Sequence, residues 1–561
     1  MLKEIREIID KSLADLNIES NFQYALEMPP ACIDADLSTN IALLISKKIK
    51  KNPKEIALII IEKIKQNSVI SDAIFLSGFI NIKLSFDYIF ENLEKEVLHT
   101  GLKTQDTENA YKNKKILVEF VSANPTGPLH IGHGRGAAYG DSLARVFEYL
   151  GANVEREYYV NDVGNQMDVL AQSVLSYINN KPLPENGYKG KYLEEIAKEI
   201  QDTGYRIQDT EVKAYTINKI LEWIKNDLEK FGIWFKNWFR ESSLYEKNEV
   251  DKIIEELLEK GFAYKKDGAI WFKSTEFSDD KDRVIVREDG RKTYLASDIA
   301  YHYNKFQRNF DEYIDIWGAD HHGYVDRMKG AVKATGSDET KLKIILYQLV
   351  NIIKGGQKVT MSTRAGEFVT LKEVLDEVGV DASRFFLLMR NSESHLDFDL
   401  DLAIKQTPEN PVYYIQYAHA RISSIFKEAE KRITDYRLSA TSATETFLPT
   451  NGSVVGADKK SLADKQDTGY RLLNLKEERE LIRKVLYFED LVKIAARDYA
   501  PNYMTKYLQD IASDFHSYYN KNRIVTDNPD LTLARLQMCQ AIKNIIYKGL
   551  YLLGVSAPEK M

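Results

Sequence analysis

Cysteine is nearly absent from this sequence. Cys32 and Cys539 are the only cysteines among 561 residues, which excludes a disulfide framework and a cysteine-rich zinc site. Long apolar runs are missing as well. The longest, at 56–61, spans about six residues, far short of the roughly 18 that a membrane-spanning helix needs. The charged opening MLKEIREIID leaves no room for the apolar core of a signal peptide. We therefore expect a cytosolic protein without a membrane anchor.

An excess of basic residues is also lacking. The formal net charge of −7 argues against a uniformly basic surface that coats nucleic acid, although it allows one basic face. Hydrophobic residues make up 44% of the chain and charged residues 29%, which is typical of a globular protein. The chain is too long for one hydrophobic core, so we expect roughly three or four domains.

The first part of the chain, residues 1–105, alternates between helical and strand-like patterns. Apolar residues recur at helical spacing through 40–66, whereas FINIKL at 79–84 alternates as in a strand. The polar stretch 103–115 then predicts a linker. These patterns indicate a small N-terminal α+β domain.

A continuous apolar segment, ILVEFV, begins at residue 116 and is typical of a buried parallel strand. A loop rich in Pro and Gly interrupts it at 125–128. Apolar residues then return at helical spacing from about Arg135 to Gly151. A strand, a loop and a helix in this order form the first unit of a doubly wound nucleotide-binding fold. YIDIWGAD at 313–320 predicts a further strand that ends in polar residues. We therefore expect a Rossmann-type α/β catalytic domain.

Helical patterns with few Gly or Pro dominate from residue 371 onward. We expect a connecting segment at 371–404 and an α-helical bundle over 405–561. Within the bundle, residues 438–468 are polar and without periodicity, which predicts a flexible surface insertion.

Two histidines stand in the predicted loop before the first helix, in the sequence His130-Ile131-Gly132-His133. An enzyme that splits ATP between the α- and β-phosphates must stabilise negative charge on both products. Imidazole N–H groups at a helix N-terminus can do so, together with free backbone N–H groups and the helix dipole. Gly132 would let the nucleotide approach the backbone closely. A zinc site is disfavoured because no HExxH pattern accompanies these histidines.

A second loop of interest is Met361-Ser362-Thr363-Arg364-Ala365-Gly366. Small polar residues with one cation can close over phosphates late in a reaction. Taken alone, such a pattern is more often an ordinary surface loop.

Together these two stretches resemble the signature motifs of the class I aminoacyl-tRNA synthetases. VEFVSANPTGPLHIGH is similar to the first motif in its arginyl form, and MSTRAG stands where the class carries Lys-Met-Ser-Lys. STNIALLISKK and GFINIKL resemble the appended N-terminal domain of arginyl enzymes. The chain is thereby identified as a member of the arginyl-tRNA synthetase family. The similarity continues through 281–302, 317–328, 381–390, 396–403, 409–425 and 548–561.

The resemblance implies a domain plan and a set of partners. Residues 1–105 would recognise the tRNA D-loop, 112–370 would form the Rossmann domain with an insertion at about 165–285, and 405–561 would bind the anticodon. The enzyme would activate L-arginine with ATP and Mg²⁺ and load it onto tRNA(Arg). We expect it to act as a monomer, without a prosthetic group or zinc.

The resemblance also implies roles for individual residues. Arginine would be held through its α-amino group and backbone by Glu119, Ser122 and Asn124, and through its guanidinium by Tyr294 and Asp298. A carboxylate suits this last task because it forms charge-assisted bonds with a guanidinium; otherwise Asp298 would be an ordinary surface acid. Catalysis would depend on His130, Gly132, His133, Ser362 and Arg364. ATP would contact Asn124, Pro125, Thr126, Gly127, His130, Gly132, His133, Asp320, His321, Met361 and Ser362.

Several of the implied positions have plain structural alternatives. Phe79 and Asn81 would touch a base of the D-loop, which suits an aromatic side chain, but Phe79 could equally be a core residue. His321 and His322 could each face the nucleoside. The anticodon domain would contribute Gln416, Tyr417 and His419, which could instead be packing residues.

The sequence departs from the class pattern at the second motif, where Thr360 and Thr363 replace the usual lysines. The leaving pyrophosphate still needs a cation. We expect Arg364 to supply it, with Lys358 and then Lys115 as alternatives.

Two other functions compete with arginine–tRNA ligation. One is adenylation of a small molecule without tRNA by another HxGH nucleotidyltransferase, which would not need the long C-terminal helices or the N-terminal extension. The other is a catalytically weakened relative that binds or regulates RNA, a hypothesis motivated only by the altered second motif.

Overall fold

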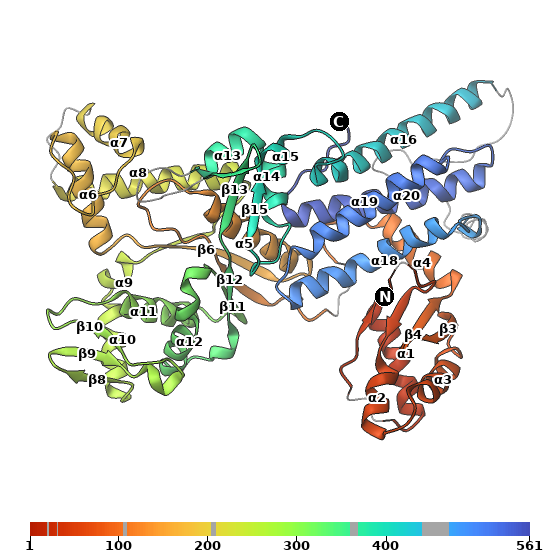
Figure 1. Cartoon of the computed structure of the whole chain (residues 1–561), viewed down its shortest axis with the longest axis horizontal. Coiled ribbons are helices and arrows are strands. Elements are labelled where there is room, and N and C mark those ends of the chain that lie inside the picture. Colours follow the sequence, from red (N-terminus) through yellow and green to blue (C-terminus); the bar gives the residue numbers. More distant parts are fainter. Residues whose placement is uncertain (19–21, 31, 105–108, 203–208, 360–368, 440–469) are drawn as a thin grey trace.

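The computed structural model of the chain divides into three regions with different layers (Figure 1). It describes residues 1–561 except 19–21, 31, 105–108, 203–208, 360–368 and 440–469. A small α+β domain lies at the N-terminus, a parallel sheet with helices on its faces occupies the centre, and long helices form the C-terminal part. The predicted fold class is confirmed. The predicted insertion at 438–468 falls almost wholly outside the described residues.

The N-terminal domain is an antiparallel sheet in the order β1-β2-β4-β3 with helices packed against it. Local signals fix its helix starts: the Asn52 side chain accepts from the Lys54 backbone N–H at 2.9 Å, and Pro53 takes the first helical position of α3. The elements are α1 (Leu2–Asp15), β1 (Leu26–Glu27), β2 (Leu37–Thr39), α2 (Ile41–Ile49), α3 (Pro53–Ile64), β3 (Ile70–Leu76), β4 (Phe79–Leu84) and α4 (Phe86–Leu98).

The central sheet has five parallel strands in the order β7-β6-β5-β11-β12. The chain runs outward from β5 to β7, returns, and then adds β11 and β12 on the other side. The order therefore reverses between β5 and β11, as in a doubly wound fold. The strands are β5 (Lys115–Glu119), β6 (Asn153–Val160), β7 (Asn237–Arg240), β11 (Glu312–Gly318) and β12 (Leu342–Tyr347).

Helix α5 (Ile131–Tyr149) follows β5 and is buried along nearly its whole length. It begins four residues earlier than the apolar spacing predicts, because His130 acts as its N-cap. The close approach of neighbours explains its glycines. A Cβ at Gly140 would lie 2.3 Å from the Phe120 ring, so only glycine lets β5 and α5 pack at this distance.

Two excursions from the sheet interrupt the Rossmann pattern. Helices α6 (Asn165–Ile178), α7 (Lys191–Asp202) and α8 (Asp209–Lys230) lie between β6 and β7, at one end of the molecule in Figure 1. Strand β7 lies within the stretch 165–285 expected as an insertion, yet it pairs with β6 as the edge of the main sheet. After β7 come α9 (Ser242–Glu246), α10 (Glu249–Glu259), the antiparallel strands β8 (Ala263–Lys266), β9 (Ala269–Phe272) and β10 (Arg283–Val286), and helices α11 (Tyr294–Gln307) and α12 (Val325–Ala334).

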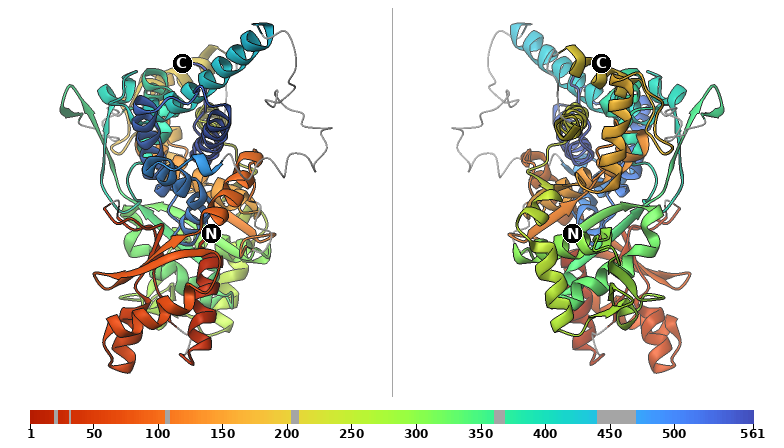
Figure 2. Two further views of the ribbon diagram at one scale, coloured as in Figure 1. Left: turned by 90° about the vertical axis from the view of Figure 1, so that its right-hand side faces the viewer. Right: turned by 90° about the vertical axis from the view of Figure 1, so that its left-hand side faces the viewer.

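A second small sheet, in the order β14-β13-β15, joins the catalytic domain to the helical region. The long C-terminal helices lie side by side, and α4 packs against both α18 and α20 where the N-terminal domain meets them (Figures 1 and 2). In the described part of the chain, no helix has both the length and the apolar composition to cross a bilayer. The elements are β13 (Val350–Lys354), β14 (Gln357–Val359), α13 (Leu371–Val378), α14 (Val380–Leu387), β15 (Leu396–Asp399), α15 (Leu400–Ile404), α16 (Pro411–Ser439), α18 (Lys476–Arg497), α19 (Tyr503–Lys521) and α20 (Pro529–Leu553).

Candidate active site

The carboxyl ends of β5 and β11 meet where the strand order of the central sheet reverses. Open α/β sheets bind ligands in the crevice at this position. Strand β5 ends at Glu119 and leads into the loop with the two histidines, while β11 ends at Gly318, just before Asp320 and His321. The topology therefore brings two of the predicted ATP-binding segments to one edge.

His130 and His133 are stacked at the start of α5, with ring centroids 3.6 Å apart. The backbone N–H of each histidine donates to Nδ1 of the other, at 3.3 and 3.4 Å. Because Nδ1 accepts in both rings, the ring proton lies on Nε2. Burial lowers the pKa of both imidazoles, most strongly that of His133, which His130 lowers further. The pair is therefore neutral at pH 7 and carries two Nε2–H donors.

Gly132 makes this stacked arrangement possible. A Cβ at position 132 would lie 2.9 Å from Cε1 of His130 and 3.0 Å from its Nδ1, closer than side chains tolerate. The glycine is thus required for the mutual capping of the two histidines, in addition to any approach of a nucleotide.

The end of β5 has a strained backbone. Val121 and Ser122 have φ angles of 69° and 38°, which lie in the left-handed region that a β-branched residue rarely adopts. Ser122 Oγ donates to Glu119 Oε1 at 2.9 Å and accepts from the Tyr159 backbone N–H at 3.1 Å. Asn124 lies further along the loop. The hydrogen bonds of Glu119 and Ser122, which were predicted to contact arginine, therefore stabilise this strained backbone.

The remainder of the predicted ATP-binding loop is tied to the helical insertion. Asn124 Nδ2 donates to Gln166 Oε1 on α6 at 2.9 Å, and Tyr192 on α7 donates to the Thr126 carbonyl at 2.8 Å. The Tyr192 ring also lies beside Gly127, and Pro125 and Thr126 form a turn. Asp320 and His321 stand exposed beyond β11, as does His322. The predicted residues Met361, Ser362 and Arg364 lie outside the described residues.

Two acidic side chains, Asp298 on α11 and Glu241 after β7, are close enough to interact electrostatically. Tyr294 and Asp298 lie one turn apart on this helix, and the Tyr324 hydroxyl donates to Asp298 Oδ2 at 2.5 Å. Burial raises the pKa of Asp298, although the hydrogen bond from Tyr324 lowers it. Glu241, which follows β7, is only 2% exposed. Burial and the Asp298 carboxylate raise the pKa of Glu241 to about 7, while a hydrogen bond from Ser297 lowers it. Two acids held this close favour a cationic ligand.

A wholly buried ammonium lies on the same helix, two turns beyond Asp298. Lys305 Nζ is 2.5 Å from Glu119 Oε2 on β5 and 2.5 Å from Asp315 Oδ1 on β11. Burial alone would lower the pKa of Lys305, but the two carboxylates raise it. Tyr301 donates to the same Glu119 oxygen at 2.9 Å, and His302 Nε2 lies 2.9 Å from Asp315 Oδ2. This network fixes α11 across both central strands.

The predicted tRNA contacts occupy two distant surfaces. Phe79 begins β4 and is partly exposed beside exposed Leu76, whereas Asn81 is buried and accepts a hydrogen bond from Ser38 Oγ at 3.0 Å. On α16, Tyr417 is partly exposed and its hydroxyl accepts from Arg421 at 2.7 Å.

The other two α16 residues are buried. Gln416 Nε2 donates to Asp381 Oδ2 at 2.8 Å and to the Ser556 carbonyl at 2.9 Å, and His419 Nδ1 lies 2.8 Å from the Pro558 carbonyl. Both side chains hold the C-terminal segment against α16, so packing accounts for them in this structure.

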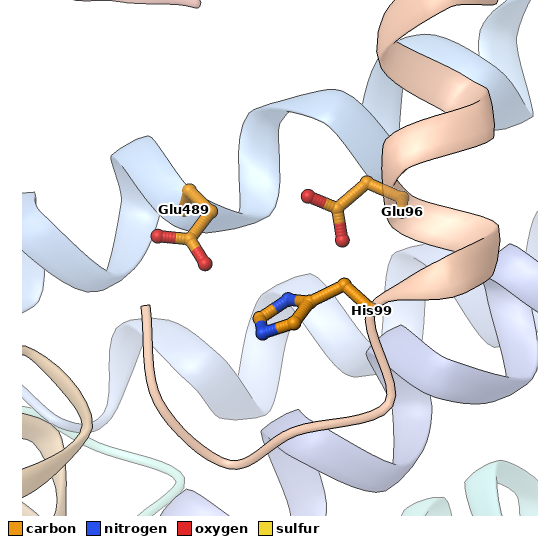
Figure 3. A group of neighbouring side chains, drawn as sticks. All are labelled: Glu96, His99 and Glu489. Atoms are coloured by element: carbon orange, nitrogen blue, oxygen red, sulfur yellow. The ribbon is translucent and has the colours of Figure 1, made fainter. Parts of the chain in front are cut away.

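One group of possible metal ligands occurs among the described residues, at the junction between α4 and the helical region. Glu96, His99 and Glu489 bring ligand atoms within 4.8 Å of one another (Figure 3). The buried Lys548 ammonium already contacts Glu96 Oε2 at 3.2 Å and His99 Nδ1 at 2.9 Å. The Lys548 ammonium, which lies on α20, thus already serves as the cation of this cluster. The cluster is separate from Asp298 and Glu241.

Comparison with known proteins agrees with this geometry. The family model for "tRNA synthetases class I (R), catalytic domain" matches residues 95–439. Models for the "Arginyl tRNA synthetase N terminal domain" and the "DALR anticodon binding domain" match 3–84 and 453–561. An arginine–tRNA ligase from Syntrophotalea carbinolica is 44% identical over 96% of this chain and 94% of its own. One from Elusimicrobium minutum is 42% identical over the full length of both.

The chain belongs to the arginyl-tRNA synthetase family. The resemblance of its two motifs to that family is therefore confirmed. The fold agrees as well, since a Thermus thermophilus arginyl-tRNA synthetase superposes over the whole chain with a TM-score of 0.76 at 21% identity.

Two buried side chains near the predicted site residues, Lys305 and Glu241, were not revealed by the sequence patterns. On α11, Asp298, Tyr301 and Lys305 repeat at helical spacing, so a polar face was visible, but not the strands that it would meet. Glu241 follows the short aromatic strand β7, which ends at the same edge of the sheet as β5. Because β7 is a short strand at the end of a helical insertion, it shows little periodicity. The sequence therefore did not indicate a role for Glu241.

Glu241 makes the ligand-free enzyme sensitive to pH. Its folded-state pKa of about 7 exceeds that of an unfolded glutamate, so its contribution to stability is present below about pH 4.5 and is lost as the pH rises through 7. Glu241→Gln cannot ionise. Relative to wild type, this variant should therefore gain up to about 3 kcal/mol between pH 5 and pH 8.

Thermal unfolding midpoints of the ligand-free proteins at pH 5, 6.5 and 8 measure this gain. Glu259→Gln, an exposed position on α10, is the control and should run parallel to wild type at every pH. A constant difference between Glu241→Gln and wild type across this range would show that Glu241 is ionised in the folded state like any surface acid.

Proposed function

We propose that this member of the arginyl-tRNA synthetase family is an arginine–tRNA ligase, which activates L-arginine with ATP and transfers it to tRNA(Arg). The observation that carries the proposal is the pair of neutral imidazole donors at the N-terminus of α5, which follows β5 at the edge of the sheet where such folds bind their ligands. This helix start suits the phosphates of ATP. Asp298 and Glu241 are proposed to line an acidic pocket that suits a guanidinium.

In the first step, the arginine carboxylate attacks the α-phosphorus of ATP, arginyl-adenylate forms, and pyrophosphate leaves with Mg²⁺. Negative charge grows on the α-phosphate and on the leaving group. The Nε2–H groups of His130 and His133 can donate to these oxygens, and the first backbone N–H groups of α5 add to the stabilisation. In the second step, a hydroxyl of the tRNA 3′ end attacks the arginyl carbonyl and AMP leaves.

Different residues are proposed to contact different parts of the arginine molecule. Asp298 and Glu241 are the partners for the guanidinium, and Tyr294, half exposed at the mouth of the pocket, can cover its plane. We expect Ser122 and Asn124, which follow β5, to hold the α-amino group together with Glu119 through its Oε1 oxygen. Glu119 Oε1 accepts one hydrogen bond among the described residues and a carboxylate oxygen can accept two.

The cation that replaces the second-motif lysine stays a prediction. Arg364 remains the first candidate from the sequence, outside the described residues. Lys358 at the end of β14 is exposed and lies 3.8 Å from Asp397, whereas Lys115 begins β5 and therefore stands at the opposite end of the strand from the site. The tRNA contacts at Phe79, Asn81, Gln416, Tyr417 and His419, and the action of the enzyme as a cytosolic monomer, are predictions as well.

Two outcomes of one assay separate this proposal from its alternatives. ATP–pyrophosphate exchange is measured with each of the twenty amino acids, with and without bulk tRNA. Exchange that depends on arginine, together with arginine on tRNA, is expected. Exchange with a different small acid and no charged tRNA would indicate another nucleotidyltransferase, and no exchange under any condition would indicate a weakened RNA-binding relative.

Arginine specificity should depend on Asp298. Asp298→Asn removes the charge partner of a desolvated guanidinium, which costs about 3 kcal/mol or more, so kcat/KM for arginine should fall at least about 100-fold. The fold should survive, because Asn can still accept from Tyr324. Arginine-dependent pyrophosphate exchange measures the loss, and Asp326→Asn, an exposed acid on the adjacent helix α12, is the matched control. A folded Asp298→Asn enzyme with near-normal kcat/KM would refute the assignment of the pocket.

A further inference from the structure

Arg135 lies in the first turns of α5, two residues after His133, and its side chain is wholly buried. Its guanidinium donates three hydrogen bonds to backbone carbonyls. One nitrogen reaches Gln348 at 2.7 Å and Ser394 at 2.8 Å, and the other reaches Asn391 at 2.7 Å. The acceptors belong to two segments that are separated from Arg135 by more than two hundred residues. The guanidinium therefore joins three distant parts of the chain.

The two segments that accept hydrogen bonds from Arg135 immediately precede strands β13 and β15 of the small sheet. Gln348 lies between β12 and β13, and Ser394 lies between α14 and β15. They are bound to each other, since the Gln348 backbone N–H donates to the Ser392 carbonyl at 2.8 Å, and β13 then pairs in parallel with β15. By binding both segments, Arg135 fixes the small sheet relative to the start of α5.

The small sheet in turn leads to the second motif. Strand β14 pairs antiparallel with β13 and ends at Val359, so MSTRAG follows it directly in the sequence. On the far side of that motif, Thr370 forms a β-bridge with His130, and the Leu371 backbone N–H donates to the Leu129 carbonyl at 2.7 Å. Both flanks of the second motif are thus tied to the first motif, one of them through Arg135.

The buried Arg135 guanidinium is unusual because, in the part of the chain that the structure describes, it forms no ion pair with a carboxylate. Among the described residues, the hydrogen-bond partners of Arg135 are neutral carbonyls, and its buried Nε has no partner. Burial lowers its pKa to about 10, so it remains charged at neutral pH. By contrast, Arg384, also wholly buried against α5, is paired with Asp141 at 2.6 Å. A buried charge without a carboxylate is costly for stability alone, which points to a role in the site.

We propose that Arg135 is a positioning residue for arginine activation, which holds the sheet that leads into the second motif at a fixed place relative to His130 and His133. The inference rests on the proposed ligase function. A cluster of groups that must meet on the phosphates of ATP is sensitive to displacement, since a shift of about 1 Å can cost about 100-fold in rate. Adenylate formation needs both motifs together. Transfer of arginine from a finished adenylate to tRNA does not involve pyrophosphate, so it is much less dependent on the hydrogen bonds of Arg135.

The test compares Arg135→Lys and Arg135→Met with wild type and with Arg384→Lys. Lysine keeps the charge and part of the hydrogen bonding, whereas methionine keeps neither. Arg384 is the matched control because it is equally buried; it donates to the Leu553 carbonyl at 2.7 Å and the Phe231 carbonyl at 3.1 Å, and it pairs with Asp141 in the middle of α5. Three quantities are measured: arginine- and ATP-dependent pyrophosphate exchange with tRNA present, single-turnover transfer from synthetic arginyl-adenylate to tRNA, and the thermal unfolding midpoint.

Exchange kcat should fall about 10-fold in Arg135→Lys and about 100-fold in Arg135→Met, with the arginine KM and the transfer rate within about threefold of wild type. Arg384→Lys should lower the unfolding midpoint at least as much, but should not separate exchange from transfer. The inference is overturned if the Arg135 variants keep wild-type exchange, if exchange and transfer decline together, or if neither variant folds, which would make Arg135 a stability residue. An inactive wild-type protein would instead remove the proposed ligase function.

Discussion

One buried ion cluster fixes the arrangement on which the site depends, namely Lys305 between Glu119 and Asp315. The two carboxylates lie on neighbouring parallel strands, at the point where the strand order reverses, and neither could be buried there without a cation between them. Lys305 supplies that cation from α11. Because Asp298 lies two turns earlier on the same helix, docking Lys305 over the sheet also sets the depth at which Asp298 enters the pocket. The residues proposed to bind arginine are therefore positioned in the fold by Lys305 and Asp315, which are not among them.

Buried cations join distant segments elsewhere in the molecule too. Arg384 links α14 to α5 and to the end of α20, and Lys548 links α20 to the last turn of α4. Arg384 is held by acceptors from different parts of the chain and Lys548 by Glu96 and His99, so each costs much to bury and tolerates little displacement. The three regions of the chain thus meet through directional polar contacts as well as apolar packing. Arg135 differs in having, within the described ranges, carbonyls alone as hydrogen-bond partners, which makes its position beside His133 the more informative.

Much of this structure follows from local sequence, and the rest does not. The apolar run at β5, the loop of Pro and Gly and the spacing along α5 predicted the first Rossmann unit, because each is a local signal. The residues Asp298 and His130 were identified through motif resemblance, and the structure places them at one edge of the sheet. The start of α5 was predicted too late because histidine is not a usual N-cap residue. The pairing of β7 and the roles of Lys305 and Glu241 depend on partners far along the chain, so the pattern around each carried no trace of them.

A double-mutant cycle between Lys305 and Asp315 tests most directly whether this ion cluster positions the pocket. Neither residue is among those proposed to contact arginine, so kcat/KM for arginine activation reports how well the cluster positions the proposed contacts, Glu119 included. It is measured in wild type, Lys305→Met, Asp315→Asn and the double variant. We predict that the two losses are strongly non-additive, with a coupling free energy of at least about 1 kcal/mol, because the two side chains contact each other directly and either single change unbalances the charges of the buried cluster. Losses that add to within about 0.5 kcal/mol would contradict the central role of this interaction.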